Sequence, residues 1–270
     1  MLIVDAQIHL WSTPGGPPHH RSEPYTADEA VREMDAAGVS RSINCPAIWD
    51  PRSNEYAQEA VASHPGRFGT MGWLPLDTAP DPEVVERLLG RPGMLGLRFV
   101  LMTPAATVAL GAGDLDWIWE VANRLGRPVA LMVPRPMLGT VGDLARRFGD
   151  INFLVDHLAI GPHDRMPAAA EDIDQLLSLA TLPNVAAKAT ATPGFSAEPF
   201  PHQDVAPVLK RVYDAFGPQR MFWGTDFTRM PITLQQCVEM FTLHLPWLRG
   251  DELEAVMGRA VCDWVGWERG

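Results

Sequence analysis

Eight short apolar runs, separated by segments with helix signals, are the feature of this sequence that most restricts its fold. The runs begin near Ile3, Arg41, Phe68, Met94, Pro128, Ile151, Asn184 and Arg220. Strands that alternate with helices form parallel sheets, because each connecting helix crosses back over the sheet. Eight such units in 270 residues are typical of a closed (β/α)8 barrel. We therefore predict a single α/β domain, a TIM barrel, over residues 1–270.

Capping residues mark the ends of several predicted helices. Thr26 begins a capping-box pattern, and the helix after it is expected to end near Gly38. Asp81, followed by proline, is expected to cap a second helix that stops at Gly90. We also expect Asp114 to cap a third helix.

The residues after the first run distinguish between two possible α/β folds. A doubly wound open sheet usually carries a glycine-rich phosphate-binding turn at this point. Residues 10–14 read Leu-Trp-Ser-Thr-Pro and lack such a turn, which favours the barrel. Residues 12–25 and 190–203 are long irregular stretches after the first and seventh runs. In a barrel both would lie on the catalytic rim as lids or binding loops.

Composition restricts partners and location. The net charge of −11 argues against non-specific binding to nucleic acid or to a membrane surface, although a pocket can be locally basic. No apolar run reaches the roughly 18 residues of a membrane-spanning helix, and no leader segment is visible. Cys45, Cys237 and Cys262 are odd in number and widely spaced, which predicts a cytoplasmic protein without disulfides. A homo-oligomer stays open.

The first run alternates apolar and polar residues. With a period of two, one face of the strand would carry Asp5, Gln7 and His9, and the other Val4, Ala6, Ile8 and Leu10. A polar face directed into the barrel would belong to a reactive site. The alternative is an edge strand whose polar face meets water.

Other strands also end in polar residues, and the carboxyl ends of barrel strands carry the active site. We expect the following side chains at the barrel mouth: Gln7, His9, Asn44 or Cys45, Arg98, Asp156, His157, Lys188 and Asp226. Asp226 follows Gly224-Thr225 and could act as a general base on water, or simply cap the next helix.

Further side chains have two readings each. Trp11, Trp49 and Trp73 follow the first three runs and would either cover a flat substrate or pack beneath the loops. Cys45 is a candidate nucleophile, but a buried core thiol is the favoured reading. The remaining histidines have no metal-cluster spacing and are treated as surface residues: His19, His20, His64, His163, His202 and His244.

Three motifs, Asp5-Ala-Gln-Ile-His9, Asp156-His157 and Trp223-Gly-Thr-Asp226, carry a family resemblance. The chain resembles the amidohydrolase superfamily over nearly its whole length, in the amidohydrolase-related branch. That branch includes 2-pyrone-4,6-dicarboxylate lactonase, sugar-acid lactonases and aromatic-acid decarboxylases. Its members typically open with Asp-x-His-x-His and end strand 8 in Trp-Gly-(Ser/Thr)-Asp.

Two departures from the family pattern affect metal binding. Gln7 replaces the first histidine of the strand-1 pair, and Met132 stands where metal-binding members place another. The resemblance leaves His9, His157 and Asp226 as metal ligands, enough for zinc with a bound water. A glutamine oxygen is a poor zinc ligand, and a thioether is too soft for zinc or manganese. We therefore predict no metal or other cofactor; the alternative is one divalent ion such as zinc or manganese.

The resemblance and the residues together predict a hydrolase that opens a lactone or related ester of a small, anionic substrate. Asp226 would be the general base, with His157 and His9 as further catalytic residues. The expected substrate-binding residues are Gln7, Arg98, Lys188, Asn44, Trp11 and Trp49. Buried cations need partners, so we expect Arg98 and Lys188 to pair with Asp156, Asp226 or the substrate. Two alternatives remain: a metal-dependent decarboxylase or hydratase of the same superfamily, and an inactive barrel that binds a small molecule.

Overall fold

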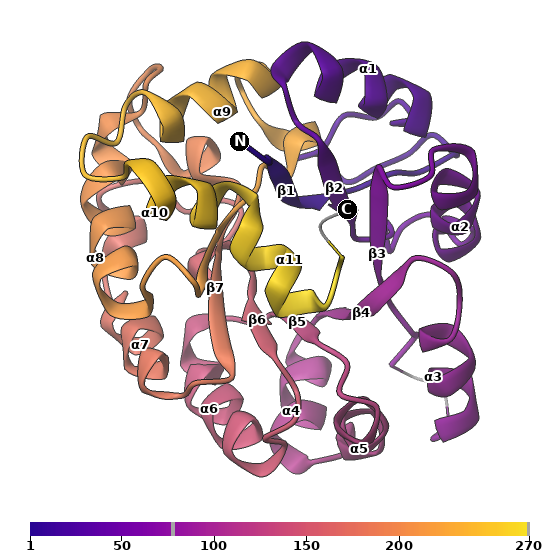
Figure 1. Cartoon of the computed structure of the whole chain (residues 1–270). Helices are drawn as coiled ribbons and strands as arrows, with labels where there is room; N and C mark the ends of the chain where they lie inside the picture. Colours follow the sequence, from indigo (N-terminus) through magenta and orange to yellow (C-terminus); the bar gives the residue numbers. More distant parts are fainter. Residues whose placement is uncertain (77–78, 269–270) are drawn as a thin grey trace.

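The computed structural model describes residues 1–76 and 79–268, and it confirms the predicted (β/α)8 barrel (Figure 1). Eight parallel strands lie side by side in sequence order. They are β1 (Val4–Ile8), β2 (Arg41–Asn44), β3 (Phe68–Gly72), β4 (Met94–Val100), β5 (Val129–Met132), β6 (Phe153–Val155), β7 (Val185–Ala189) and β8 (Met221–Trp223).

The helices surround the strands in Figure 1. They are α1 (Ala27–Ala37), α2 (Ser53–Ser63), α3 (Pro82–Leu89), α4 (Pro104–Ala112), α5 (Asp116–Arg124), α6 (Leu138–Arg147), α7 (Asp174–Leu177), α8 (Ala206–Phe216), α9 (Leu234–Thr242), α10 (Gly250–Glu254) and α11 (Ala260–Val265). None of the helices in the described ranges is long and apolar enough to cross a membrane.

Two of the three predicted helix N-caps are confirmed by the structure. Thr26 and Asp81 accept backbone N–H groups at the starts of α1 and α3, as predicted. The prediction for Asp114 is wrong, because α5 begins one residue beyond Leu115 and has no side-chain cap. The sequence analysis also missed α4, a mostly exposed helix between β4 and α5.

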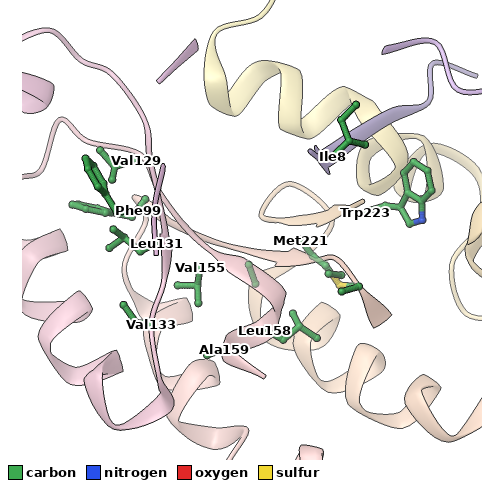
Figure 2. Close-up of a cluster of buried hydrophobic side chains, with 14 of the residues drawn as sticks. Ile8, Phe99, Val129, Leu131, Val133, Val155, Leu158, Ala159, Met221 and Trp223 are labelled. Carbon is green, nitrogen blue, oxygen red and sulfur yellow. The ribbon is translucent and has the colours of Figure 1, made fainter. Parts of the chain in front are cut away.

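Two apolar layers form the core. One takes a residue from every strand and packs against α11, which lies across the ring of strands in Figure 1. It fills the interior and contains Val4, Ala6, Ile43, Cys45, Met71, Leu95, Ala130, Leu154, Ala186 and Phe222. The other layer lies between strands and helices, and Figure 2 shows part of it, including Phe99, Leu131 and Trp223. All three cysteines are buried.

The barrel closes where β8 meets β1. The backbone N–H of Asp226 donates to Gln7 O at 2.8 Å, and that of Thr225 donates to the Asp5 carboxylate at 2.8 Å. Gly224 permits this approach, because a Cβ there would lie 2.9 Å from Ala6 N. Strand β1 is therefore an interior strand, and the edge-strand alternative is excluded.

The prediction that apolar and polar side chains alternate strictly along β1 is wrong. The register between β1 and β2 shifts between Asp5 and Ile8. Ala6 packs in the interior layer, whereas Ile8 packs in the outer one. Such a bulge reverses the side-chain alternation. Asp5 is therefore separated from Gln7 and His9, and its carboxylate accepts the N–H of Gln7 at 3.0 Å.

Candidate active site

The main candidate residues lie just beyond the strands that carry them. Strands β6 and β8 end at Val155 and Trp223, so both strands stop before the polar residues that were predicted to end them. His157 and Asp226 both have φ near 54°, in the left-handed region. Residues with a Cβ rarely adopt this conformation, and it is often found at functional sites. The Asp226 side chain makes no capping bond to the short helical turn that follows it.

Asp156 is the centre of a buried ion-pair cluster. Its Oδ2 accepts a hydrogen bond from Arg98 Nε at 2.7 Å, and its Oδ1 lies 2.8 Å from Lys188 Nζ. Burial raises the pKa of Asp156, but Lys188 and Arg98 outweigh that effect and hold it well below its usual range. The two cations that the sequence assigns to substrate binding are therefore both paired with Asp156.

Lys188 also sets the orientation of Gln7. Its ammonium group donates to Gln7 Oε1. An ammonium group cannot accept, so the amide oxygen must lie on this side. Gln7 Nε2 consequently faces His157 Nε2 at 3.1 Å and His9 Nε2 at 3.5 Å. Lys188 is therefore a positioning residue behind the site.

Hydrogen bonds assign the tautomers of both histidines. His9 Nδ1 lies 2.6 Å from Cys45 O, and a carbonyl only accepts, so Nδ1 carries the proton. His157 Nδ1 lies 2.7 Å from Thr190 Oγ1, while its Nε2 accepts from the glutamine amide. Burial lowers the pKa of His157 to about 3, so this ring is neutral near pH 7. Both Nε2 atoms are directed toward Asp226.

Asp226 lies between these rings and an arginine. Its Oδ1 is 3.1 Å from His9 Nε2, and its Oδ2 is 3.7 Å from His157 Nε2 and 3.4 Å from Arg229 Nη1. Burial raises the pKa of Asp226, but the neighbouring imidazoles of His9 and His157 outweigh that effect and hold it well below the usual value. Oδ1 makes no hydrogen bond of normal geometry within the described part of the chain. An ionised carboxylate with a free lone pair can accept a proton.

A cavity of about 310 Å³ lies over Asp226. Five predicted site residues line it: His9, Trp49, Arg98, His157 and Asp226. Its other lining residues are Pro17, His19, His20, Ile48, Val100, Met102, Met132, Pro162 and Arg229. We call it the catalytic cavity. Its size is at the lower end of the range for small-ligand sites.

Trp11 and Asn44, two of the predicted substrate-binding residues, do not line the catalytic cavity. Trp11 is fully buried and packs edge-on against Trp49, which supports the alternative in which it packs beneath the loop. Asn44 is also fully buried. Ile43 of β2 and Cys45, the residue after the strand, pack in the interior layer, whereas Asn44 accepts the backbone N–H of Leu10 at 3.0 Å. Cys45 is a core thiol whose pKa is raised by burial.

Sequence reasoning missed His20 and Arg229. The loop of residues 12–25 folds inward, and His20 Nδ1 meets Thr228 Oγ1 at 2.7 Å. Burial lowers the pKa of His20 to about 3. The only local signals were its place in a rim loop and the position of Arg229 three residues after Asp226. His202, also predicted at the surface, is buried as well.

The site also contains a possible metal-binding group. His9, His20 and Asp226 each offer one ligand atom, and these atoms lie within 4.8 Å of one another. Oδ1 of Asp226 has no hydrogen-bond partner among the described residues, so it could coordinate a metal ion. This set differs from the predicted one, because His20 takes the place of His157. Geometry therefore permits one divalent ion held by three ligands, as in catalytic zinc sites.

The charges nearby favour an anion over a cation. In the ion pairs of the described residues, the three cations Arg98, Lys188 and Arg229 share two carboxylates, those of Asp156 and Asp226. Buried charge is costly without a partner, so a dication would add to an existing positive excess. A substrate carboxylate would neutralise that excess.

An α/β barrel with a buried, ionised carboxylate and imidazoles at the carboxyl ends of its strands defines an enzyme site. The chain belongs to the amidohydrolase family, whose sequence profile matches residues 4–258. It is therefore a hydrolase of that family, as the motifs predicted.

Relatives of known description agree with this assignment. The chain is 25% identical over 243 residues to L-fucono-1,5-lactonase from Burkholderia ambifaria, covering 83% of this chain and 79% of the relative. A Burkholderia multivorans amidohydrolase with bound zinc has a TM-score of 0.82 at 18% identity, covering 98% and 99% of the two chains. A probable 2-pyrone-4,6-dicarboxylic acid hydrolase from Acinetobacter baumannii, with citric acid bound, has a TM-score of 0.79 at 16% identity, covering 98% and 100%.

Proposed function

We propose that this protein hydrolyses a lactone, or a related ester, of a small carboxylated substrate, with Asp226 as the general base. The observation that carries the proposal is an ionised carboxylate facing a cavity that two arginines also line, Arg98 and Arg229. The similarity to an L-fucono-1,5-lactonase supports lactone chemistry. Esters need less electrophilic activation than amides, so fixed cations suffice to stabilise the oxyanion.

The reaction has two steps. Asp226 takes a proton from a water molecule as that water attacks the lactone carbonyl carbon. The tetrahedral oxyanion then collapses and expels the ring oxygen, which takes the proton back from Asp226. His9 and His157 flank the position of the attacking water, and the Gln7 amide holds both rings in place.

The arginines divide the remaining work. Arg229, whose Nη1 lies 3.4 Å from Asp226 Oδ2, faces the oxyanion that forms beside the attacking water. Arg98, paired with Asp156 through Nε, directs its other nitrogens to the substrate carboxylate. Removal of one donor to an oxyanion typically lowers kcat by about 10²–10³. Lys188 orders Gln7 rather than the substrate.

The metal-dependent alternative rests on a different set of contacts. If zinc or manganese binds, His9, His20 and Asp226 would hold it, and the ion would supply Lewis-acid activation. A decarboxylase or hydratase of the same family would then be favoured. The positive excess near the site is the reason for preferring the metal-free hydrolase.

The test is turnover of carboxylated lactones by Asp226→Asn. We expect an intact fold and a kcat lowered by about 10³ or more, because an amide cannot accept the proton. Asp214→Asn is the matched control, since that exposed carboxylate pairs only with Lys210 in the ion pairs of the described chain. Near-normal turnover by Asp226→Asn would contradict the role.

A further inference from the structure

We infer that the substrate carries a sizeable apolar group, aryl or branched alkyl, beside its carboxylate and lactone. This inference deepens the proposed function and rests on it. It comes from a second cavity of about 550 Å³, larger than the catalytic cavity, which we call the side cavity. The two cavities share Ile48, Arg98 and Val100, so they are contiguous at the mouth of the barrel.

The side cavity has apolar walls. Its surface comes mainly from the residues after β3, from β4, and from α4. Among the described residues that line it, Arg98 is the single charged side chain. Phe99, Leu74 and Ala106 are examples of the rest. Apolar pockets with a few placed polar groups are typical of small-molecule sites.

The other polar side chains in this wall are already engaged. Trp73 Nε1 donates to Ser53 Oγ at 3.1 Å, so its ring offers the cavity an apolar surface. Thr103 Oγ1 accepts the N–H of Ala106 at 3.2 Å as the cap of α4. A polyhydroxylated chain in this cavity would lose hydrogen bonds to water and gain few in return. The cavity therefore excludes sugar-like groups and fits an apolar one.

Arg98 explains how one substrate can use both cavities. Its guanidinium lies at their boundary and lines each of them. A carboxylate bound there would place the lactone over Asp226 on one side and the apolar group against α4 on the other. The inferred substrate class thus differs from the sugar lactone named for the Burkholderia ambifaria relative.

The experiment compares three carboxylated δ-lactones that carry hydrogen, phenyl or a trihydroxypropyl chain at the same ring carbon. The parent protein should hydrolyse the phenyl lactone with a kcat/KM about 10- to 100-fold above the other two. Equal kcat/KM values for all three, or a preference for the hydroxylated lactone, would overturn the inference while leaving the proposed hydrolysis intact.

A pair of variants on α4 localises the effect. Ala106→Gln places a polar, uncharged, helix-favouring side chain in the side cavity. It should lower kcat/KM for the phenyl lactone about 10-fold and leave the hydrogen lactone nearly unchanged. Val108→Gln, at a position 69% exposed on the same helix, should change neither. An equal loss for every lactone with Ala106→Gln would contradict the assignment.

Binding separates this inference from the proposed chemistry. Calorimetry with 3-phenylpropionate, propionate and gluconate requires no turnover. We expect 3-phenylpropionate to bind the parent most tightly and to lose that advantage in Ala106→Gln. If no lactone is hydrolysed but this order holds, the proposed function fails and the apolar side cavity stands. If the three acids bind alike, the inference fails.

Discussion

Asp156→Asn should destabilise the fold far more than any surface carboxylate. Asp156 is the shared partner of Arg98, at 2.7 Å, and of Lys188, at 2.8 Å, and the three side chains are at most 6% exposed. Breaking a single buried ion pair costs about 3–5 kcal/mol, because the remaining charge is left uncompensated. Here two cations lose the same partner, so we expect the upper part of that range.

The measurement is urea unfolding at pH 7, with thermal unfolding as a second readout. A loss of that size corresponds to a Tm lower by roughly 6–20 °C for a domain of this length. Asp214→Asn is the matched control, because its pair with Lys210 joins side chains that are 57% and 41% exposed. Exposed pairs contribute about 0–1 kcal/mol, so the control should unfold close to the parent.

A second substitution separates stranded charge from lost packing. In the Asp156→Asn background, Lys188→Met removes one of the stranded cations at similar length. The double variant should be more stable than Asp156→Asn alone, with a coupling above about 1 kcal/mol. The reasoning is refuted if Asp156→Asn unfolds within 1 kcal/mol of the control, or if the double variant loses stability additively.

Three further outcomes are expected. Gly224→Ala should lower the free energy of unfolding in urea by about 1–3 kcal/mol, because the added Cβ would lie 2.9 Å from Ala6 N. Gly149→Ala is the control and should cause no such loss, because no atom lies within 4 Å of the Cβ position there. Equal effects of the two substitutions would contradict the close approach at Gly224. The pKa of His157 is lowered to about 3, so the neutral ring contributes stability that is present above pH 6.5 and is lost as the pH falls. Between pH 6.5 and 5 the free energy of unfolding of the parent should fall by about 2 kcal/mol relative to that of His157→Gln. Parallel curves of unfolding free energy against pH for the two proteins would argue against a neutral ring. Purified protein should carry well below one divalent ion per chain and keep its activity after chelation, and stoichiometric zinc lost together with activity would instead favour the metal-dependent reading.

The order of the apolar runs along the chain and their local periodicity carry most of the structural prediction that is possible from the sequence. Alternating apolar runs and caps such as Thr26 are local signals, and they predict the eight strands and the barrel. Once the barrel is known, every strand ends at the same rim, so His9, His157 and Asp226 had to lie near one another.

Other features depend on contacts between distant parts of the chain. The bulge in β1 is set by pairing with β2 and β8, so a two-residue period could not reveal that Asp5 is separated from Gln7. Arg98 and Lys188 each looked like a substrate ligand. Their shared carboxylate, Asp156, follows a different strand from either of them.

The sequence by itself determined the barrel, the rim where its strands end, and the place of Asp226, the proposed base, on that rim. Tertiary structure decided what surrounds that base. His20 reaches it because a rim loop folds back to Thr228, 208 residues away along the chain. The side cavity exists because α4 and the residues after β3 leave a space beside Arg98. Local patterns predict which segments form strands and helices, but the contents and shape of a cavity are set by packing among segments that the sequence does not place side by side.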